Sequence, residues 1–221
     1  MKKRFNALLF DLDGTLIDPR TGITRSVQYA LQKLGWSEIP EETDLLWTIG
    51  PPLRENLAKL LQSDNKDLIE EGAGYYRERF GEVGVFENEV YLGVSGMLNK
   101  LKQEEFLLYI ATSKPYPYAV RILEHLNLAQ YFDKVYGSEF DGTRSNKGEL
   151  LAHLLVAEGE KAVNALMIGD RLHDIRAARQ NSLAAAGVTY GYGSLQELID
   201  AGADFLVDKP EDIHTVVWMA D

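Results

Sequence analysis

The fold is decided by a stretch near the start of the chain, Phe5-Asn6-Ala7-Leu8-Leu9-Phe10-Asp11-Leu12-Asp13-Gly14-Thr15. Its apolar residues, Ala7 to Phe10, predict a buried strand, because a short apolar run bounded by polar residues is typical of one. The strand ends in two carboxylates one residue apart, followed by a glycine and a small hydroxyl. In open α/β sheets, ligands and catalytic groups collect beyond the carboxyl ends of the strands. The stretch therefore predicts such a sheet, with a polar site at the end of its first strand.

Asp11 and Asp13 form the first candidate site. In strict strand geometry their side chains point to opposite faces, so both reach one site only if the chain turns at once. Gly14 can supply that turn, because glycine adopts backbone conformations that other residues avoid. Two acids this close repel each other unless a cation or a proton lies between them, which is a physical reason to expect a metal ion. Asp-Gly is also a common turn pair, so Asp13 taken alone has a purely structural alternative.

Composition limits the classes of function. The chain has 221 residues, enough for one large domain or for a core with a smaller companion. A net charge of -11 disfavours non-specific binding to nucleic acid polymers or anionic membranes. Without cysteine there are neither disulfides nor thiolate metal sites, so a metal must use oxygen or imidazole ligands. Since neither a membrane span of ~20 apolar residues nor a signal peptide is evident, we expect a cytoplasmic protein.

A helical insert is expected directly after the first strand. The spacing of apolar residues predicts helices over residues 21–34, 53–61 and 65–80. No clear strand is predicted before Val90. This block therefore has the character of a small helical domain inserted into another domain.

Strands and helices alternate after Gly93, which predicts a parallel sheet covered on both faces. We expect an α/β protein with a Rossmann-like, doubly wound parallel sheet core over residues 1–16 and 89–221. A small α-helical cap domain would occupy residues 17–88. The strands predicted after the insert are 106–111, 134–136, 165–168, 183–188 and 205–207, and the helices are 95–103, 118–126, 147–158 and 174–180.

Four polar clusters lie just past predicted strands or at the start of a helix. In a parallel sheet all carboxyl ends lie on one edge, so these clusters can converge there. Taken singly, the last three also have structural alternatives, which are a turn, a solvated helix residue and a helix N-cap. The clusters are Asp11 with Asp13, Thr112-Ser113-Lys114, Lys147, and Asp170 with Asp174.

At these positions the chain resembles the haloacid dehalogenase superfamily, and specifically its Mg²⁺-dependent phosphatases. The motifs occur in the family's order, and the resemblance covers essentially the whole chain. The tail from Gly187 to Asp204 resembles the phosphoglycolate phosphatase branch, and Gly137 to Arg144 is similar to 5'-nucleotidase-like relatives. The four motifs are Asp11-Leu12-Asp13-Gly14-Thr15, then Thr112 or Ser113, then Lys147, and then Gly169-Asp170-Arg171 with Asp174.

The resemblance implies a metal site and a pair of catalytic acids. Asp11 would be the nucleophile that forms an aspartyl-phosphate. Asp13 would protonate the leaving oxygen and then activate water. Mg²⁺ would be held by Asp11, the main-chain carbonyl of Asp13 and Asp170. Asp174 would take a metal-bound water or orient Lys147.

The resemblance also implies how the substrate is held. The hydroxyl of Thr112 and the amide of Ser113 would bind phosphoryl oxygens, while Lys147 would neutralise charge on the nucleophile and the phosphoryl group. Arg54, near the start of an insert helix, would help the cap to choose the substrate, with a solvated surface arginine as its structural alternative. The implied partner is a small phosphorylated metabolite, such as phosphoglycolate or a nucleoside monophosphate. The chain would act as a monomer or a homodimer.

Two other functions remain open for these residues. A sugar phosphomutase of the β-phosphoglucomutase type would return the phosphoryl group to a sugar instead of water. A non-catalytic phosphoryl-binding protein would use the same scaffold, although the intact acids and lysine argue against it. A dehalogenase is disfavoured, because its chemistry needs no metal and leaves Asp13 and Asp170 without a purpose. The crossings near residues 17–19 and 88–93 predict hinges for closure of the cap.

Overall fold

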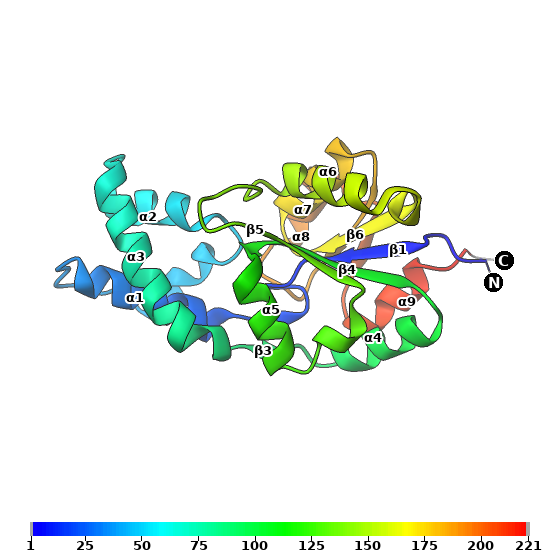
Figure 1. Cartoon of the computed structure of the whole chain (residues 1–221), viewed down its shortest axis with the longest axis horizontal. Helices are drawn as coiled ribbons and strands as arrows, with labels where there is room; N and C mark the ends of the chain where they lie inside the picture. Colours follow the sequence, from blue (N-terminus) through cyan, green and yellow to red (C-terminus); the bar gives the residue numbers. More distant parts are fainter. Residues whose placement is uncertain (1, 220–221) are drawn as a thin grey trace. The chain divides into compact units, whose positions relative to one another are not determined.

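The computed structural model describes residues 2–219, and the chain forms two compact units (Figure 1). One unit comprises Met1–Asp18 and Val90–Asp221, and the other is Pro19–Glu89. The chain passes between the units twice. At these crossings β2 (Ile17–Asp18) and β3 (Glu89–Val90) pair into a separate two-stranded sheet.

The first unit is built on a six-stranded sheet in the order β5-β4-β1-β6-β7-β8, and each neighbouring pair is parallel. β1 lies inside the sheet and is buried along its whole length, which explains its uninterrupted apolar sequence. The predicted parallel α/β core is confirmed. Its strands are β1 (Ala7–Phe10), β4 (Leu107–Pro115), β5 (Lys134–Ser138), β6 (Ala165–Gly169), β7 (Ala184–Val188) and β8 (Phe205–Val207).

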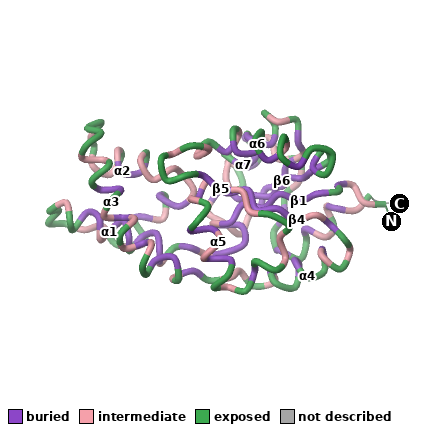
Figure 2. The backbone as a smooth tube through the Cα atoms, viewed as in Figure 1, coloured by how far each residue is buried: buried purple, intermediate pink, exposed green. Residues whose placement is uncertain are grey.

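Helices cover both faces of this sheet, with α6 and α7 on one side and α4, α5 and α9 on the other (Figure 1). Ala7 and Leu9 of β1 share a core cluster with Leu151 of α6 and Ile175 of α7. Figure 2 shows the central strands as mainly buried. The helices are α4 (Val94–Gln103), α5 (Tyr116–His125), α6 (Lys147–Glu158), α7 (Leu172–Gln180), α8 (Leu195–Ala201) and α9 (Ile213–Val216), with 3-10 turns η3 (Ala129–Tyr131), η4 (Gly159–Ala162) and η5 (Pro210–Asp212).

The second unit is helical in its described residues. The N-terminus of its longest helix is capped by Asn65, whose side chain accepts hydrogen bonds from the amides of Asp67 and Leu68. Another helix, α1, buries one face through Ile23, Val27 and other small or apolar residues. The elements are α1 (Arg20–Lys33), α2 (Leu53–Leu61) and α3 (Lys66–Glu82), with 3-10 helices η1 (Glu42–Thr48) and η2 (Gly84–Phe86).

Strand β4 differs from the prediction, because it extends to Pro115. Thr112, Ser113 and Lys114 therefore lie inside the strand rather than after it. Its pairing with β5 changes register between Ala111 and Pro115. Such an irregularity frees side chains from the regular alternation and can re-aim them.

Two helices also differ from the prediction. α7 begins at Leu172 and Arg171 takes the N-cap position, so Asp174 is the third helical residue and the N-cap alternative is wrong. α8 was not predicted, because a helix of seven residues is too short to show a clear helical repeat of apolar residues.

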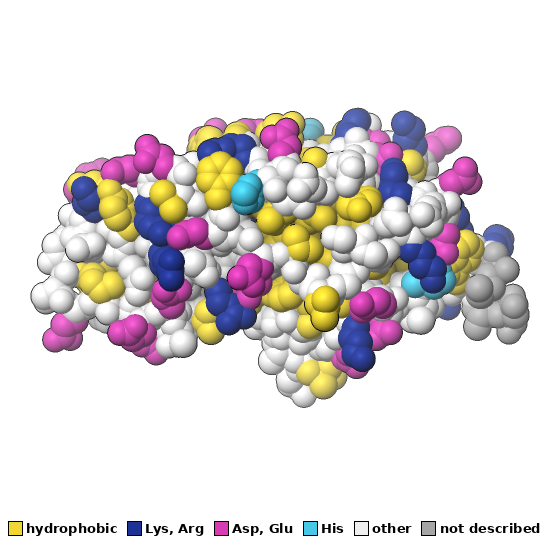
Figure 3. Space-filling model, turned by 90° about the horizontal axis from the view of Figure 1, so that it is seen from below, with side chains coloured by type: hydrophobic (Ala, Val, Ile, Leu, Met, Phe, Trp, Pro, Cys, Tyr) yellow, Lys and Arg dark blue, Asp and Glu magenta, His cyan; other side chains and the backbone are white. Residues whose placement is uncertain are grey.

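The surface carries charges of both signs. On the face seen in Figure 3, lysine and arginine side chains are interspersed with aspartates and glutamates. None of the helices formed by residues 2–219 is both long and apolar enough to cross a membrane.

Candidate active site

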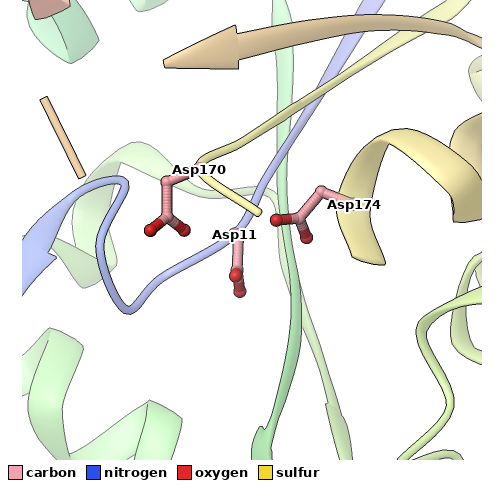
Figure 4. A group of neighbouring side chains, drawn as sticks. All are labelled: Asp11, Asp170 and Asp174. Atoms are coloured by element: carbon pink, nitrogen blue, oxygen red, sulfur yellow. The ribbon is translucent and has the colours of Figure 1, made fainter. Parts of the chain in front are cut away.

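Three aspartates from two distant parts of the chain meet beyond the carboxyl ends of the sheet strands (Figure 4). Asp11 directly follows β1, Asp170 directly follows β6, and Asp174 lies in the first turn of α7. One carboxylate oxygen of each lies within 4.8 Å of the other two, and all three residues are buried. They meet because β1 and β6 are paired in parallel and therefore end side by side. We call these three residues the aspartate centre.

Glycines make room for Asp170 in the aspartate centre. A Cβ atom at Gly14, whose φ is +78°, would lie 2.3 Å from Asp170 Oδ2. A Cβ atom at Gly191 would lie 2.4 Å from Asp170 Cβ. The amide of Tyr192 donates a hydrogen bond to Asp170 Oδ2 at 2.8 Å. The loop over residues 190–193 had no predicted role in the site, although two glycines shortly after a strand were a signal of close backbone approach.

Lys147 connects two members of the aspartate centre. Its Nζ donates to the main-chain oxygen of Ala111 at 2.8 Å, and lies 2.9 Å from both Asp11 Oδ1 and Asp174 Oδ1. One main-chain carbonyl and two carboxylates surround the ammonium group and hold the side chain in place. Burial alone would lower the pKa of Lys147, but Asp11 and Asp174 outweigh it and raise the pKa above its usual value. Lys147 is therefore a fixed positive charge beside the predicted nucleophile.

Asp13 lies outside the aspartate centre and its side chain binds a second buried lysine. Lys114 Nζ lies 2.9 Å from Asp13 Oδ2, with the two side chains 6% and 13% exposed. Burial raises the pKa of the Asp13 carboxyl, and the nearby Lys114 opposes that rise. The sequence pattern groups Lys114 with its neighbours but predicts no role for it. Lys114 lies in the part of β4 where the pairing with β5 changes register, which the sequence does not signal.

Thr112 and Ser113 lie in the same last part of β4. Thr112 Oγ1 accepts a hydrogen bond from the amide of Lys114 at 3.2 Å, so its own hydroxyl proton stays available as a donor. The main-chain oxygen of Ser113 accepts from Ser138 Oγ at 2.7 Å, which ties the end of β4 to the end of β5. These contacts fix the backbone from which both residues would reach a phosphoryl group.

Arg54 belongs to the other unit, on α2, and forms an ion pair with Glu70 of α3. A second arginine, Arg77, approaches the same carboxylate at 3.9 Å. Both arginines are only partly exposed, so neither is a freely solvated side chain. The role of Arg54 in choosing the substrate stays a prediction.

The aspartate centre fits a divalent cation held by oxygen ligands. Asp170 Oδ1 is buried and has no hydrogen-bond partner within the part of the chain that the structure describes. Burial, and then the carboxylates of Asp174 and Asp11, raise the pKa of Asp170 well above its usual value. Burial also raises the pKa of Asp174 to about 6, against the opposing effect of Lys147. With Asp13, four carboxylates face only two lysines, and one divalent cation would balance the excess negative charge.

Comparison with known proteins identifies the class. Residues 8–188 match the family of haloacid dehalogenase-like hydrolases, and the chain belongs to that family. It is 47% identical over 195 residues to a 5'-nucleotidase of Pseudomonas aeruginosa, covering 88% of this chain and 87% of that one. It is 30% identical over 220 residues to a phosphoglycolate phosphatase of Vibrio parahaemolyticus, covering 95% of each.

The fold agrees with this assignment. The crystal structure of a predicted phosphatase from Clostridium acetobutylicum superposes with a TM-score of 0.91 at 40% identity, covering 96% of this chain and 98% of that one. The chain is therefore a phosphatase of the haloacid dehalogenase-like family, a hydrolase of phosphoric monoesters.

Proposed function

We propose that the protein is a Mg²⁺-dependent phosphatase that hydrolyses small phosphomonoesters through an aspartyl-phosphate on Asp11, with nucleoside 5'-monophosphates as its main substrates. The observation that carries this proposal is the aspartate centre, with Lys147 bridging two of its members. The substrate class is supported by the 47% identity to a protein named 5'-nucleotidase, against 30% to one named phosphoglycolate phosphatase.

In the first step, an Asp11 oxygen would bond to phosphorus while the bond from phosphorus to the substrate oxygen breaks. Lys147 would offset negative charge that builds up beside Asp11, and the Thr112 hydroxyl and Ser113 amide would hold phosphoryl oxygens. When bound by Asp11, Asp170 and the main-chain carbonyl of Asp13, Mg²⁺ would supply positive charge to the phosphoryl group. Asp174 would hold Lys147 in place.

Asp13 would serve both steps as acid and then base. It would give its proton to the leaving oxygen, and later take a proton from the water that bonds to phosphorus as the bond to Asp11 breaks. Its raised pKa supports this role, because a carboxyl that holds a proton more readily is a better acid near neutral pH.

We also propose that the unit Pro19–Glu89 is the cap and that Arg54 takes part in substrate choice. Replacing Arg54 by Met is expected to raise KM for a nucleoside monophosphate about tenfold, while kcat with p-nitrophenyl phosphate stays near the wild-type value. Arg77→Met is the matched control, because Arg77 approaches the same Glu70 carboxylate. An unchanged KM in the Arg54 variant would remove Arg54 from the proposal.

The main test is phosphate release from nucleoside 5'-monophosphates, phosphoglycolate, pyrophosphate and p-nitrophenyl phosphate, with Mg²⁺ and after its removal by a chelator. We expect the highest kcat/KM with a nucleoside monophosphate, no turnover without metal, and no turnover in Asp11→Asn. Asp200→Asn, an exposed aspartate in α8, is the control and should keep full activity. An active Asp11→Asn enzyme would refute the assignment of Asp11 as the nucleophile. Turnover that needs a sugar bisphosphate would favour the phosphomutase.

A further inference from the structure

We propose that Lys114 is a positioning residue for Asp13, and that it fixes which carboxylate oxygen of Asp13 handles the proton. This inference rests on the proposed function, in which Asp13 is the acid and base. It assigns a separate task to each of the two buried lysines. Lys147 serves Asp11 and Asp174, whereas Lys114 serves Asp13.

The backbone of β4 directs Lys114 into the site. Thr112 and Lys114, two residues apart, are both buried, whereas Ser113 between them is more exposed. The hydrogen bond from the Lys114 amide to Thr112 Oγ1 stabilises the backbone of β4 where its pairing with β5 changes register. An ammonium group buried in this way is costly unless it has a charged partner, and Asp13 provides one.

The two oxygens of Asp13 are not equivalent. Oδ2 lies 2.9 Å from Lys114 Nζ. Oδ1 is buried and has no hydrogen-bond partner among residues 2–219. A buried polar atom without a partner in the protein alone is unusual and calls for a reason. We assign that oxygen to the substrate: Oδ1 would give its proton to the leaving oxygen and later take one from water, while Lys114 holds Oδ2.

Another ion pair in the same unit shows what a purely structural pair looks like. Lys102 Nζ lies 3.1 Å from Asp133 Oδ2, and both side chains are one-third exposed. Both Asp133 oxygens have partners, because Oδ1 accepts from Lys102 and Oδ2 also accepts from the amide of Leu108. The Asp13–Lys114 pair differs in its burial and in the oxygen that it leaves open.

Substrates with different leaving groups test this assignment. A nucleoside leaves as an alkoxide and needs a proton, whereas p-nitrophenolate leaves readily without one. Lys114→Met should lower kcat for a nucleoside monophosphate about a hundredfold, which is the typical cost of misplacing a catalytic group. The first-turnover release of p-nitrophenolate should be nearly unchanged. Because Asp13 also activates water, the second step should then limit turnover, and a burst of about one p-nitrophenolate per enzyme should appear.

Three comparisons complete the experiment. Lys102→Met should leave kcat and the first-turnover rate unchanged with both substrates. In an Asp13→Asn background, Lys114→Met should cause little further loss, because the two residues act as one unit. Lys114→Gln repeats the test should the Met variant fail to fold, since it keeps a hydrogen-bond donor without the charge.

An equal loss of first-turnover rate on both substrates would overturn the proposal, because Lys114 would then act on the phosphoryl group directly. Unchanged kinetics, or a full hundredfold loss in the Asp13→Asn background, would overturn it as well. Full activity of Asp13→Asn on both substrates would refute the proposed acid-base role itself, and that result is independent of any Lys114 variant.

Discussion

Two buried acidic clusters lie at opposite ends of helix α6, and they differ in how far their charges are satisfied. At the start of the helix, Lys147 contacts the aspartate centre, where Asp170 Oδ1 lacks a hydrogen-bond partner among the described residues. At its end, Glu158 accepts hydrogen bonds from Lys134 at 2.6 Å, Tyr136 at 2.5 Å and Tyr109 at 2.9 Å. We call Glu158 and its three donors, Lys134, Tyr136 and Tyr109, the Glu158 cluster.

The two clusters shift the pKa of their acids in opposite directions. Burial would raise the pKa of Glu158, but its three hydrogen-bond donors lower it to about 2. In the aspartate centre burial prevails, and the pKa values of Asp170 and Asp174 are raised. A buried charge that serves stability is saturated by protein groups, whereas a site that binds a ligand keeps groups unsatisfied. For these two clusters burial does not distinguish the cases, whereas the hydrogen-bond partners of Glu158 and Asp170 do.

The largest effect that this comparison predicts is in Asp170→Asn. We expect a loss of activity of about 10³-fold or more, because a charge that acts on the phosphoryl group through the metal site is removed. The metal-free protein should be as stable as the wild type or more so, since Asn keeps an acceptor for the Tyr192 amide and removes an unsatisfied charge. Phosphate release measures the activity, and urea unfolding of the metal-free protein measures the stability. A marked loss of stability would make Asp170 a structural residue.

Glu158→Gln should behave in the opposite way. We expect the free energy of unfolding to fall by about 2 kcal/mol, because the charge-assisted bonds to Lys134 and the two tyrosines weaken. The kcat at 25 °C should stay near the wild-type value. Glu149→Gln, an exposed position on the same helix, is the control and should change neither quantity. A large fall in kcat with unchanged stability would break the distinction between the clusters.

The pH dependence of stability should also separate the clusters. The folded pKa of Glu158, about 2, lies below its ordinary value of 4.5. Glu158 therefore contributes stability above pH 4.5 that is lost as the pH falls toward 2. In the metal-free protein, Asp174 has a folded pKa of about 6, above its ordinary value of 3.8. It holds a proton that the unfolded chain has released, so its contribution falls as the pH rises from about 4 through 6.

Urea unfolding between pH 3 and 8 measures these contributions as differences from the wild type. The stability deficit of Glu158→Gln relative to the wild type should shrink as the pH falls. The stability of Asp174→Asn relative to the wild type should increase as the pH rises through 6. Saturating Mg²⁺ should abolish the second difference for the wild type, because a bound cation favours the ionised carboxylates. Parallel curves for wild type and Asp174→Asn without metal would contradict the raised pKa.

The sequence predicts one cluster much better than the other. Strand ends in a parallel sheet converge, so the amino-acid order predicts that Asp11 and Asp170 can meet at one edge. Lys147 was singled out by the family resemblance, because a lysine at a helix start taken alone resembles a solvated one. Glu158 gives no such signal, because a glutamate at a helix end resembles any solvated one. Its partners Tyr109 and Tyr136 come from two separate strands, and only their packing brings them together.

Around the aspartate centre, the contacts that were not predicted depend on the local path of the backbone. Lys114 pairs with Asp13 from the part of β4 that extends past the predicted end of the strand at Ala111. Tyr192 reaches Asp170 because the loop after β7 folds back over it. Neither event follows from apolar periodicity, which fixes elements and their order but not the path of the chain where the elements end.

The smallest expected effect concerns how that loop supports Asp170. The Tyr192 hydroxyl hydrogen-bonds to Asp18, while its amide donates to Asp170. Tyr192→Phe keeps the amide and removes only the anchor, so we expect about 1 kcal/mol less stability and a roughly two- to fivefold weaker affinity for Mg²⁺. Titration calorimetry on the metal-free protein measures the affinity without turnover. Tyr190→Phe, which removes a bond to the main-chain oxygen of Thr15, is the matched control. If both variants bind Mg²⁺ as the wild type does, the glycines and the backbone amide suffice to hold Asp170, and the aspartate centre does not depend on the tyrosine hydroxyls.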